Sequence, residues 1–252
     1  MKKIVYILFF ISSLLSAQNV EKLFEEANDM YKIGKYEEAI AYYEKIESNN
    51  DISSELYYNL GNCYYKLNNI AATIYNYEKA LLIDPLNADA TNNLIFAKRL
   101  TIDNIEALPK SVFQKFDENY IKKLSYNNWA IVAVIFSILG SLLFLLFYFS
   151  YTPSKKRFFF TGSIVCMILL VVSVSLSYKE YAYSISNIDA IVFANKTEVK
   201  NSPTFNSDDI FTLHEGTKVK VLDSIDNWKK IKLADGKIGW IDAEDIKVLK
   251  IF

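Results

Sequence analysis

Two long stretches without a charged residue constrain this sequence most, Trp129 to Phe149 and Phe158 to Leu176. Each holds about 20 residues, and at about 1.5 Å rise per residue each helix would be about 30 Å long, which matches the hydrocarbon core of a bilayer. A buried core helix can be as apolar, but it is seldom this long and seldom occurs twice in succession. We therefore predict a transmembrane hairpin, with helices over residues 129–149 and 158–178.

The charges around the hairpin indicate its orientation. Lys155, Lys156 and Arg157 lie in the predicted turn over residues 150–157, and short basic loops stay on the cytoplasmic side. Residues 1–17 have the pattern of a signal peptide, with two lysines, an apolar stretch and a small-residue cleavage point. An uncleaved membrane anchor is the alternative. Both signals predict a membrane protein with two spans, a cytoplasmic turn, and N- and C-terminal domains outside the cytoplasm.

Residues 18–100 repeat with a period of 34. At this spacing Ala27 corresponds to Gly61 and Tyr43 to Tyr77, and a small residue at the first position lets two helices pack closely. The pattern resembles the tetratricopeptide repeat, which implies pairs of antiparallel helices. Two pairs and a closing helix give about five helices. Because roughly three repeats are usually needed for independent stability, such a short array should rely on a partner.

One helix of each pair should line a groove that binds a protein segment. Asparagine can hold an extended peptide backbone through paired hydrogen bonds, and tyrosine offers flat contact area at a low entropic cost. Ordinary solvated positions are the alternative interpretation. Phe24 stands where the repeat family's clamp for terminal carboxylates needs lysine, so we do not expect that ligand. The predicted groove residues are Phe24, Asn28, Tyr31, Lys32, Tyr58, Asn59, Asn62, Tyr65 and Lys66.

Residues 101–128 are predicted to be a polar link followed by an amphipathic helix. Apolar residues from Val112 to Leu124 recur every three or four positions, which is typical of one helix face. The position just before Trp129 suits the membrane interface, whereas a soluble helix packed on the repeat is an equally good interpretation.

A stripe of small residues predicts how the hairpin packs. Ala133, Ser137 and Ser141 follow at four-residue steps on the first span, and small residues allow close contact between helices in a membrane. Neither span contains an ionisable residue, so the sequence offers no ion path or proton relay.

Residues 188–252 alternate in the manner of short strands and predict a small all-β barrel. The sequence around Gly216 and Gly239 resembles the bacterial SH3-type domain. Trp228 matches the tryptophan that floors the proline-peptide groove of eukaryotic relatives, although Asp242 and Asp245 replace the proline and tyrosine found there; partly buried packing of Trp228 is the alternative. The five expected strands are 191–193, 217–222, 228–233, 237–241 and 246–249.

Few residues could carry chemistry. His214 is the only histidine, and Cys63 and Cys166 are far apart in the sequence, whereas a zinc site usually needs three or four nitrogen or sulfur ligands. The sequence has no glycine-rich phosphate loop, and a formal net charge of −1 gives no electrostatic reason to expect nucleic acid. We predict no enzyme activity, no cofactor and no metal.

The order of these parts resembles the BatE family, the tetratricopeptide-repeat proteins of the Bacteroides aerotolerance (Bat) operon. The stretches from Ala97 to Ile105 and from His214 to Val219 add to the resemblance. It implies an assembly with von Willebrand A-domain membrane proteins, other Bat proteins and a MoxR-type ATPase, linked to oxygen or stress tolerance. The expected fold is a multi-domain membrane protein with a helical repeat, a hairpin and an SH3-like barrel. Two functions stay open, a scaffold for other membrane proteins and a binder of peptidoglycan.

Overall fold

The computed structural model describes residues 20–250, and the predicted signal peptide therefore lies outside the described residues. The chain forms two compact units. One unit combines residues 20–83, Asn87–Ala107 and residues 189–250. The other comprises Asp84–Leu86 and Leu108–Ile188. The segments on both sides of the predicted hairpin thus fold together.

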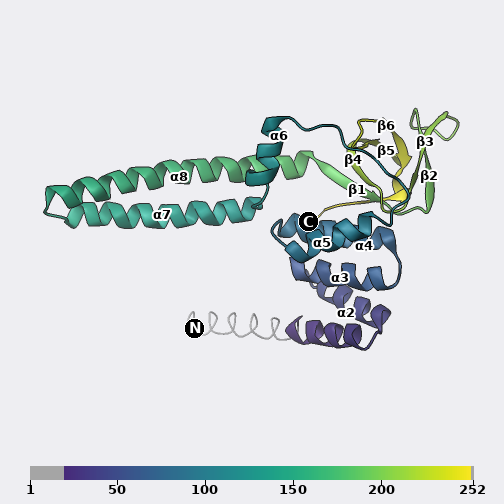
Figure 1. The fold of residues 1–252 in the computed structure, drawn as a ribbon, viewed down its shortest axis with the longest axis horizontal. Helices are drawn as coiled ribbons and strands as arrows, with labels where there is room; N and C mark the ends of the chain where they lie inside the picture. The colour runs from purple at the N-terminus through teal and green to yellow at the C-terminus, as the bar shows by residue number, and fades with distance from the viewer. Residues whose placement is uncertain (1–19, 251–252) are drawn as a thin grey trace, which may run out of the picture. The chain divides into compact units, whose positions relative to one another are not determined.

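The N-terminal part of the first unit is an array of helices, as the repeat predicts. Gly34, at φ +81°, allows the tight turn after the first helix. The Ser53 and Asn87 side chains cap two later helices by accepting hydrogen bonds from backbone N–H groups. The helices of this array, labelled from α2 in Figure 1, are residues 20–32, α2 (Tyr36–Ser48), α3 (Ser54–Lys66), α4 (Ile70–Ile83) and α5 (Ala88–Lys98).

Small residues set the packing inside each helix pair. Ala27 is fully buried, and a Cβ added at Gly61 would lie 2.5 Å from two carbons of the Tyr77 ring. Tyr43 and Tyr77, which are 34 residues apart, are the large buried rings on the opposite helices. The close approach predicted at these positions is therefore observed.

The C-terminal part of the first unit is a seven-stranded sheet, here called the β domain. The prediction of five strands was wrong because β2 and β3 were not recognised. Three of the five residues of β2 are charged, and only Thr197 and Val199 turn inward. The strand order is β3-β2-β6-β5-β4-β1-β7. The strands are β1 (Ile188–Val192), β2 (Lys196–Lys200), β3 (Asp209–His214), β4 (Lys218–Ile225), β5 (Trp228–Lys232), β6 (Ile238–Asp242) and β7 (Ile246–Val248).

The helical array and the β domain share a hydrophobic core, although they were predicted from the sequence as separate domains. Ile74 and Leu94 of the array belong to one buried cluster with Ile191 and Leu249 of the β domain. Gly216, at φ +83°, lies so close to the array that an added Cβ would be 3.0 Å from Cδ1 of Ile74. Only glycine satisfies both the backbone angle and the contact.

A network of ion pairs and hydrogen bonds, here called the polar seam, joins the helical array to the β domain. The buried carboxylate of Glu78 in α4 accepts hydrogen bonds from Lys98 Nζ at 2.7 Å and from Lys218 Nζ at 2.8 Å, the second lysine coming from β4. Lys218 Nζ also lies 3.1 Å from the carboxylate of Asp189. Burial favours the neutral acid, but the two lysines prevail and hold the pKa of Glu78 below its usual value.

The segment after α5 is part of this seam and is not simply a polar link. Asp103 Oδ1 lies 2.8 Å from Nδ1 of His214, while its Oδ2 accepts hydrogen bonds from the His214 N–H and the Thr217 hydroxyl. Ile105 packs against the core of the β domain. The single histidine therefore joins the segment to the β domain.

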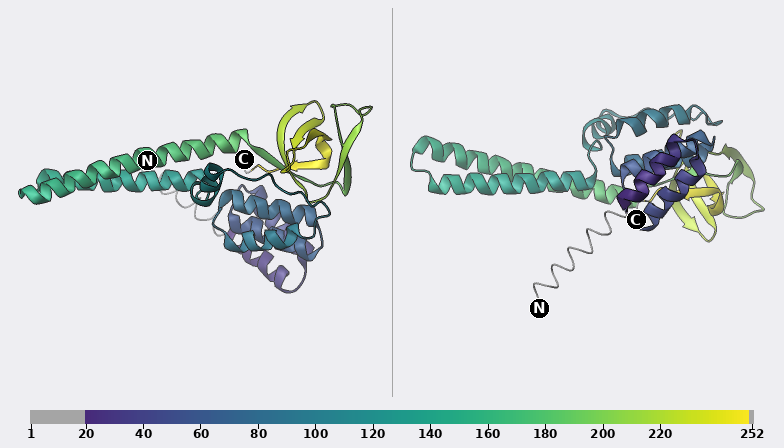
Figure 2. Two further views of the ribbon diagram at one scale, coloured as in Figure 1. Left: turned by 45° about the horizontal axis from the view of Figure 1, so that its top comes forward. Right: turned by 90° about the horizontal axis from the view of Figure 1, so that it is seen from below.

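The second unit contains two long helices that lie side by side (Figures 1 and 2). They are α7 (Tyr126–Phe149) and α8 (Pro153–Ser186), and both are long and apolar enough to cross a membrane. They are preceded by α6 (Val112–Phe116) and a π-helical turn, η1 (Asp117–Ile121), in place of the single amphipathic helix that was predicted.

Two details of the hairpin differ from the prediction. The α8 helix begins at Pro153, because proline suits the first position of a helix, so Lys155, Lys156 and Arg157 lie in helix and not in the turn. The small residues Ser137 and Ser141 are exposed, whereas Ala133 is buried.

The α7 and α8 helices pack closely at Gly140. An added Cβ there would lie 3.2 Å from Cβ of Cys166, and the Gly140 carbonyl accepts a hydrogen bond from the Ser163 hydroxyl at 3.2 Å. Ser137 and Ser141 lie away from this contact because a four-residue step turns about 40° beyond a full rotation of the helix. The seven-residue step from Ala133 to Gly140 returns almost to the same face.

Candidate functional site

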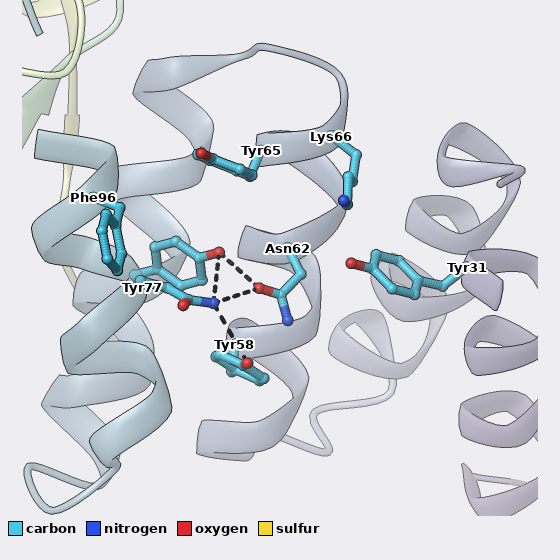
Figure 3. A pocket seen from close by; sticks show the side chains of 8 residues that line it. Tyr31, Tyr58, Asn62, Tyr65, Lys66, Tyr77 and Phe96 are labelled. Atoms are coloured by element: carbon cyan, nitrogen blue, oxygen red, sulfur yellow. Dashed lines mark hydrogen bonds between the residues drawn. The ribbon is translucent and has the colours of Figure 1, made fainter. Parts of the chain in front are cut away.

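A pocket of about 270 Å³ opens on the helical array (Figure 3). Four helices contribute to it, because Tyr31 comes from residues 20–32 and the others from α3, α4 and α5. It lies where the repeat predicts a binding groove. The lining residues are Tyr31, Tyr58, Asn62, Tyr65, Lys66, Tyr77, Asn93 and Phe96.

Five of the nine predicted groove residues line this pocket: Tyr31, Tyr58, Asn62, Tyr65 and Lys66. The other four do not. Phe24 packs edge-on against Tyr43, with ring centroids 5.5 Å apart, and Lys32 is exposed and pairs with Asp29 at 2.9 Å. Asn28 binds Tyr43, and Asn59 is half-buried outside the pocket.

The sequence interpretation missed Tyr77, Asn93 and Phe96. Asn93 and Phe96 lie in the closing helix α5, 34 residues after Asn59 and Asn62. Continuing the repeat spacing into that helix would have found both. Tyr77 was recognised only as the repeat counterpart of Tyr43.

The two repeat asparagines bind tyrosines of their own helix pair. The Tyr43 hydroxyl donates to Asn28 Oδ1 at 2.6 Å, and the Tyr77 hydroxyl donates to Asn62 Oδ1 at 2.7 Å. Asn62 Oδ1 also accepts a hydrogen bond from Asn93 Nδ2 at 3.0 Å. In Figure 3 the bonds from Tyr77 and Asn93 end on the oxygen of Asn62, while its amide nitrogen is turned away from them. A bound peptide would therefore meet the Nδ2 donor of Asn62.

The pocket is aromatic with a basic edge. Burial raises the pKa of Tyr77 and that of Tyr31, which further favours the neutral phenols as hydrogen-bond donors. Lys66 is the one charged residue in the lining. The arrangement suits a segment that places an apolar side chain on the tyrosine rings and presents carbonyl or carboxylate oxygens to Asn62 and Lys66.

A second hollow, of about 300 Å³, lies on the β domain beside Trp228. The Trp228 side chain is buried, as its packing interpretation predicts, yet it forms part of the wall. Phe205 lies edge-on to Trp228, with ring centroids 5.1 Å apart, and is 73% exposed. Both lysines and carboxylates surround these rings. The lining residues are Lys196, Thr197, Glu198, Lys200, Phe205, Trp228, Asp242 and Asp245.

The structure gives no support for a catalytic or metal-binding role of the candidate residues within residues 20–250. Burial raises the pKa of the Cys63 thiol to about 12, which opposes formation of the nucleophilic thiolate. Within residues 20–250, no group of three His, Cys, Asp or Glu side chains is arranged to hold a metal ion.

Comparison with protein families supports the two domain types. The family model of the tetratricopeptide repeat matches residues 54–87, and a second model of that repeat matches residues 31–50. The model of the bacterial SH3 domain matches residues 196–247. No curated protein matched the sequence significantly. The chain therefore contains tetratricopeptide repeats, which are typical of non-enzymatic scaffolds, and a bacterial SH3 domain.

Proposed function

We propose that this chain is a non-enzymatic scaffold, anchored in the membrane, whose repeat groove binds an extended segment of another protein. The aromatic pocket between Tyr31, Tyr58 and Tyr65 carries this proposal, because it lies on a repeat type that mediates protein–protein interaction. Its size suits one side chain of a bound segment, and Asn62 and Lys66 can hold the neighbouring backbone or an acidic group.

The membrane arrangement we propose has both ends of the hairpin in the periplasm. The first unit contains residues from before and after α7 and α8, which supports a topology with two spans and both flanking segments on one side of the membrane. The basic residues Lys155, Lys156 and Arg157 favour the cytoplasm for the other end. A bacterial SH3 domain is also suited to a location outside the cytoplasm.

The partners we propose follow from the resemblance to the BatE family. They are membrane proteins with von Willebrand A domains and other Bat proteins, in a complex that serves aerotolerance or the stress response. This part of the proposal depends on the resemblance and is separable from the groove itself.

Site-specific photo-crosslinking tests the groove. A crosslinking amino acid at Tyr65, which is 41% exposed in the pocket, should capture a discrete partner from intact cells. The matched control carries the same amino acid at Lys45, an exposed position of α2 outside the pocket. Lys66→Glu should abolish the Tyr65 product, whereas Lys32→Glu should leave it. Equal capture at both positions, or none at Tyr65, would contradict the proposal.

The hollow beside Trp228 supports a second candidate function, binding of peptidoglycan. The hollow offers aromatic contact through the exposed Phe205 and through Trp228, which forms part of its wall. The surrounding lysines and carboxylates could hold a short peptide stem. Phe205→Ala should then release the detergent-solubilised protein from purified cell wall in sedimentation, with Tyr65→Ala as the control. No sedimentation of the unmodified protein would exclude this function.

A further inference from the structure

We propose that the segment Val112–Ile121, here called the elbow, lies in the lipid headgroup region of the leaflet at which the hairpin emerges. The elbow comprises α6 and η1. This inference rests on the proposed membrane anchor, because a lipid surface is available to the elbow only if α7 and α8 span the bilayer.

The elbow exposes an unusual amount of apolar surface. Val112 is 81% exposed, Phe113 is 87% exposed, and Phe116 and Tyr120 are also exposed. No residue of α6 or η1 is buried. A contiguous apolar surface of this kind usually marks a contact with a partner or a membrane.

The depth of the elbow is fixed by bonds to residues at or beside the ends of the uncharged stretches of both long helices. The Trp129 indole Nε1 donates to the Ile121 carbonyl at 3.1 Å, and Trp129 begins the apolar stretch of the first span. Asp117 pairs with Lys179, the first charged residue after the apolar stretch of α8. Both anchor points are therefore at the depth where the chain leaves the hydrocarbon core, which is the headgroup region.

The composition of this region agrees with that depth. Tryptophan and tyrosine are enriched at the membrane interface, where the lysine ammonium also reaches the headgroups. Trp129, Tyr120 and Tyr181 lie in the elbow or at the adjoining helix ends, and the Lys122 ammonium lies 3.8 Å from the ring centroid of Tyr183. Lys115 in the elbow and Lys123 just after it are exposed.

The elbow keeps its shape through local bonds. Ser111 Oγ accepts a hydrogen bond from the Gln114 N–H, and Gln114 Oε1 accepts one from the Ser111 N–H. This capping box starts α6 without help from a folded partner. A segment that is pre-formed, apolar and held at headgroup depth matches a lipid surface better than a soluble protein partner.

Spin labels on single introduced cysteines test the depth of the elbow. The full-length protein is reconstituted in vesicles of phosphatidylethanolamine and phosphatidylglycerol, and the collision rates of the label with oxygen and with a water-soluble nickel chelate are compared. Cys63 and Cys166 are both buried, so the reagent should select the introduced cysteine. The labelled positions are Phe113→Cys and Phe116→Cys in the elbow, Ile138→Cys on the exposed face of α7, and Glu25→Cys as the aqueous control.

We expect the ratio of oxygen to nickel collisions at positions 113 and 116 to be several-fold higher than at position 25 and lower than at position 138. If position 138 is deep while both elbow positions match position 25, the elbow is in water and the inference is overturned, although the membrane anchor stands. If position 138 also matches position 25, the hairpin does not span the bilayer and the proposed anchor fails first.

Discussion

Replacement of Lys218 by methionine tests whether the helical array and the β domain unfold as one body. Lys218 lies in β4, yet its ammonium is 2.8 Å from the carboxylate of Glu78 in α4. At this distance and an effective dielectric constant of about 20, the attraction is about 6 kcal/mol. Desolvation of the two ions offsets a large part of it. Because Lys98 still neutralises part of the charge on Glu78, we expect Lys218→Met to cost about 2–3 kcal/mol.

Hydrogen exchange followed by mass spectrometry gives the decisive measurement, because it reports α4 and the β domain separately. A loss of 2–3 kcal/mol corresponds to exchange of the α4 amides about 30- to 150-fold faster, although the substitution lies in another domain. Glu78→Gln should cost less, since Lys98 and Lys218 are partly exposed and can regain water. The double variant should cost less than the sum of the two single variants.

The control variant is Lys237→Met, which removes an exposed lysine from the same β domain. It should leave the exchange of α4 unchanged. If Lys218→Met accelerates exchange only in β4 and β5 while α4 keeps its protection, the two parts unfold independently and the reasoning from the seam is wrong.

Three further predictions concern the first unit. Gly61→Ala should cost about 2–3 kcal/mol in denaturant unfolding, because its Cβ would overlap the Tyr77 ring; an unchanged unfolding midpoint would argue against the close packing. Glu78 and Asp103 have pKa values held below their usual ones in the folded protein, so their stabilisation is complete above about pH 4.5 and is lost as the pH falls through the folded values. A pH series should therefore show a shallower acid loss for Glu78→Gln than for the parent protein. Cys63, buried and with a pKa of about 12, should react with thiol reagents only at the rate of unfolding, and rapid labelling in the native state would contradict its burial.

The features that sequence predicted correctly are local or periodic. Uncharged stretches about 20 residues long and a 34-residue spacing are visible in one dimension, so the long helices and the repeat were predictable. The polar seam was not predictable, because in the sequence Lys218 is one charged residue among several on a strand with alternating polarity. Only the fold brings it to Glu78, 140 residues earlier in the chain.

The sequence predicted which types of residue line the candidate site, but not how their polar atoms are hydrogen-bonded. The groove asparagines were expected to face a ligand with both polar atoms, whereas the oxygens of Asn28 and Asn62 are occupied by tyrosine hydroxyls. Those tyrosines follow at the same interval in both repeats, so the spacing carried the information once hydrogen bonding was considered. Phe205 lies outside any strand, and no periodic pattern pointed to it.

The seam has a consequence for the synthesis of this protein. Glu78 leaves the ribosome long before Lys218, and at 5–20 residues per second the 140 residues between them take roughly 7–30 s to make. During that interval the apolar surface of Ile74 and Leu94 has no β domain to cover it. The helical array must therefore wait in an incomplete state while the hairpin is translated. A chain that stops before β4 would leave this surface and an incompletely neutralised Glu78 carboxylate for proteases and chaperones to recognise.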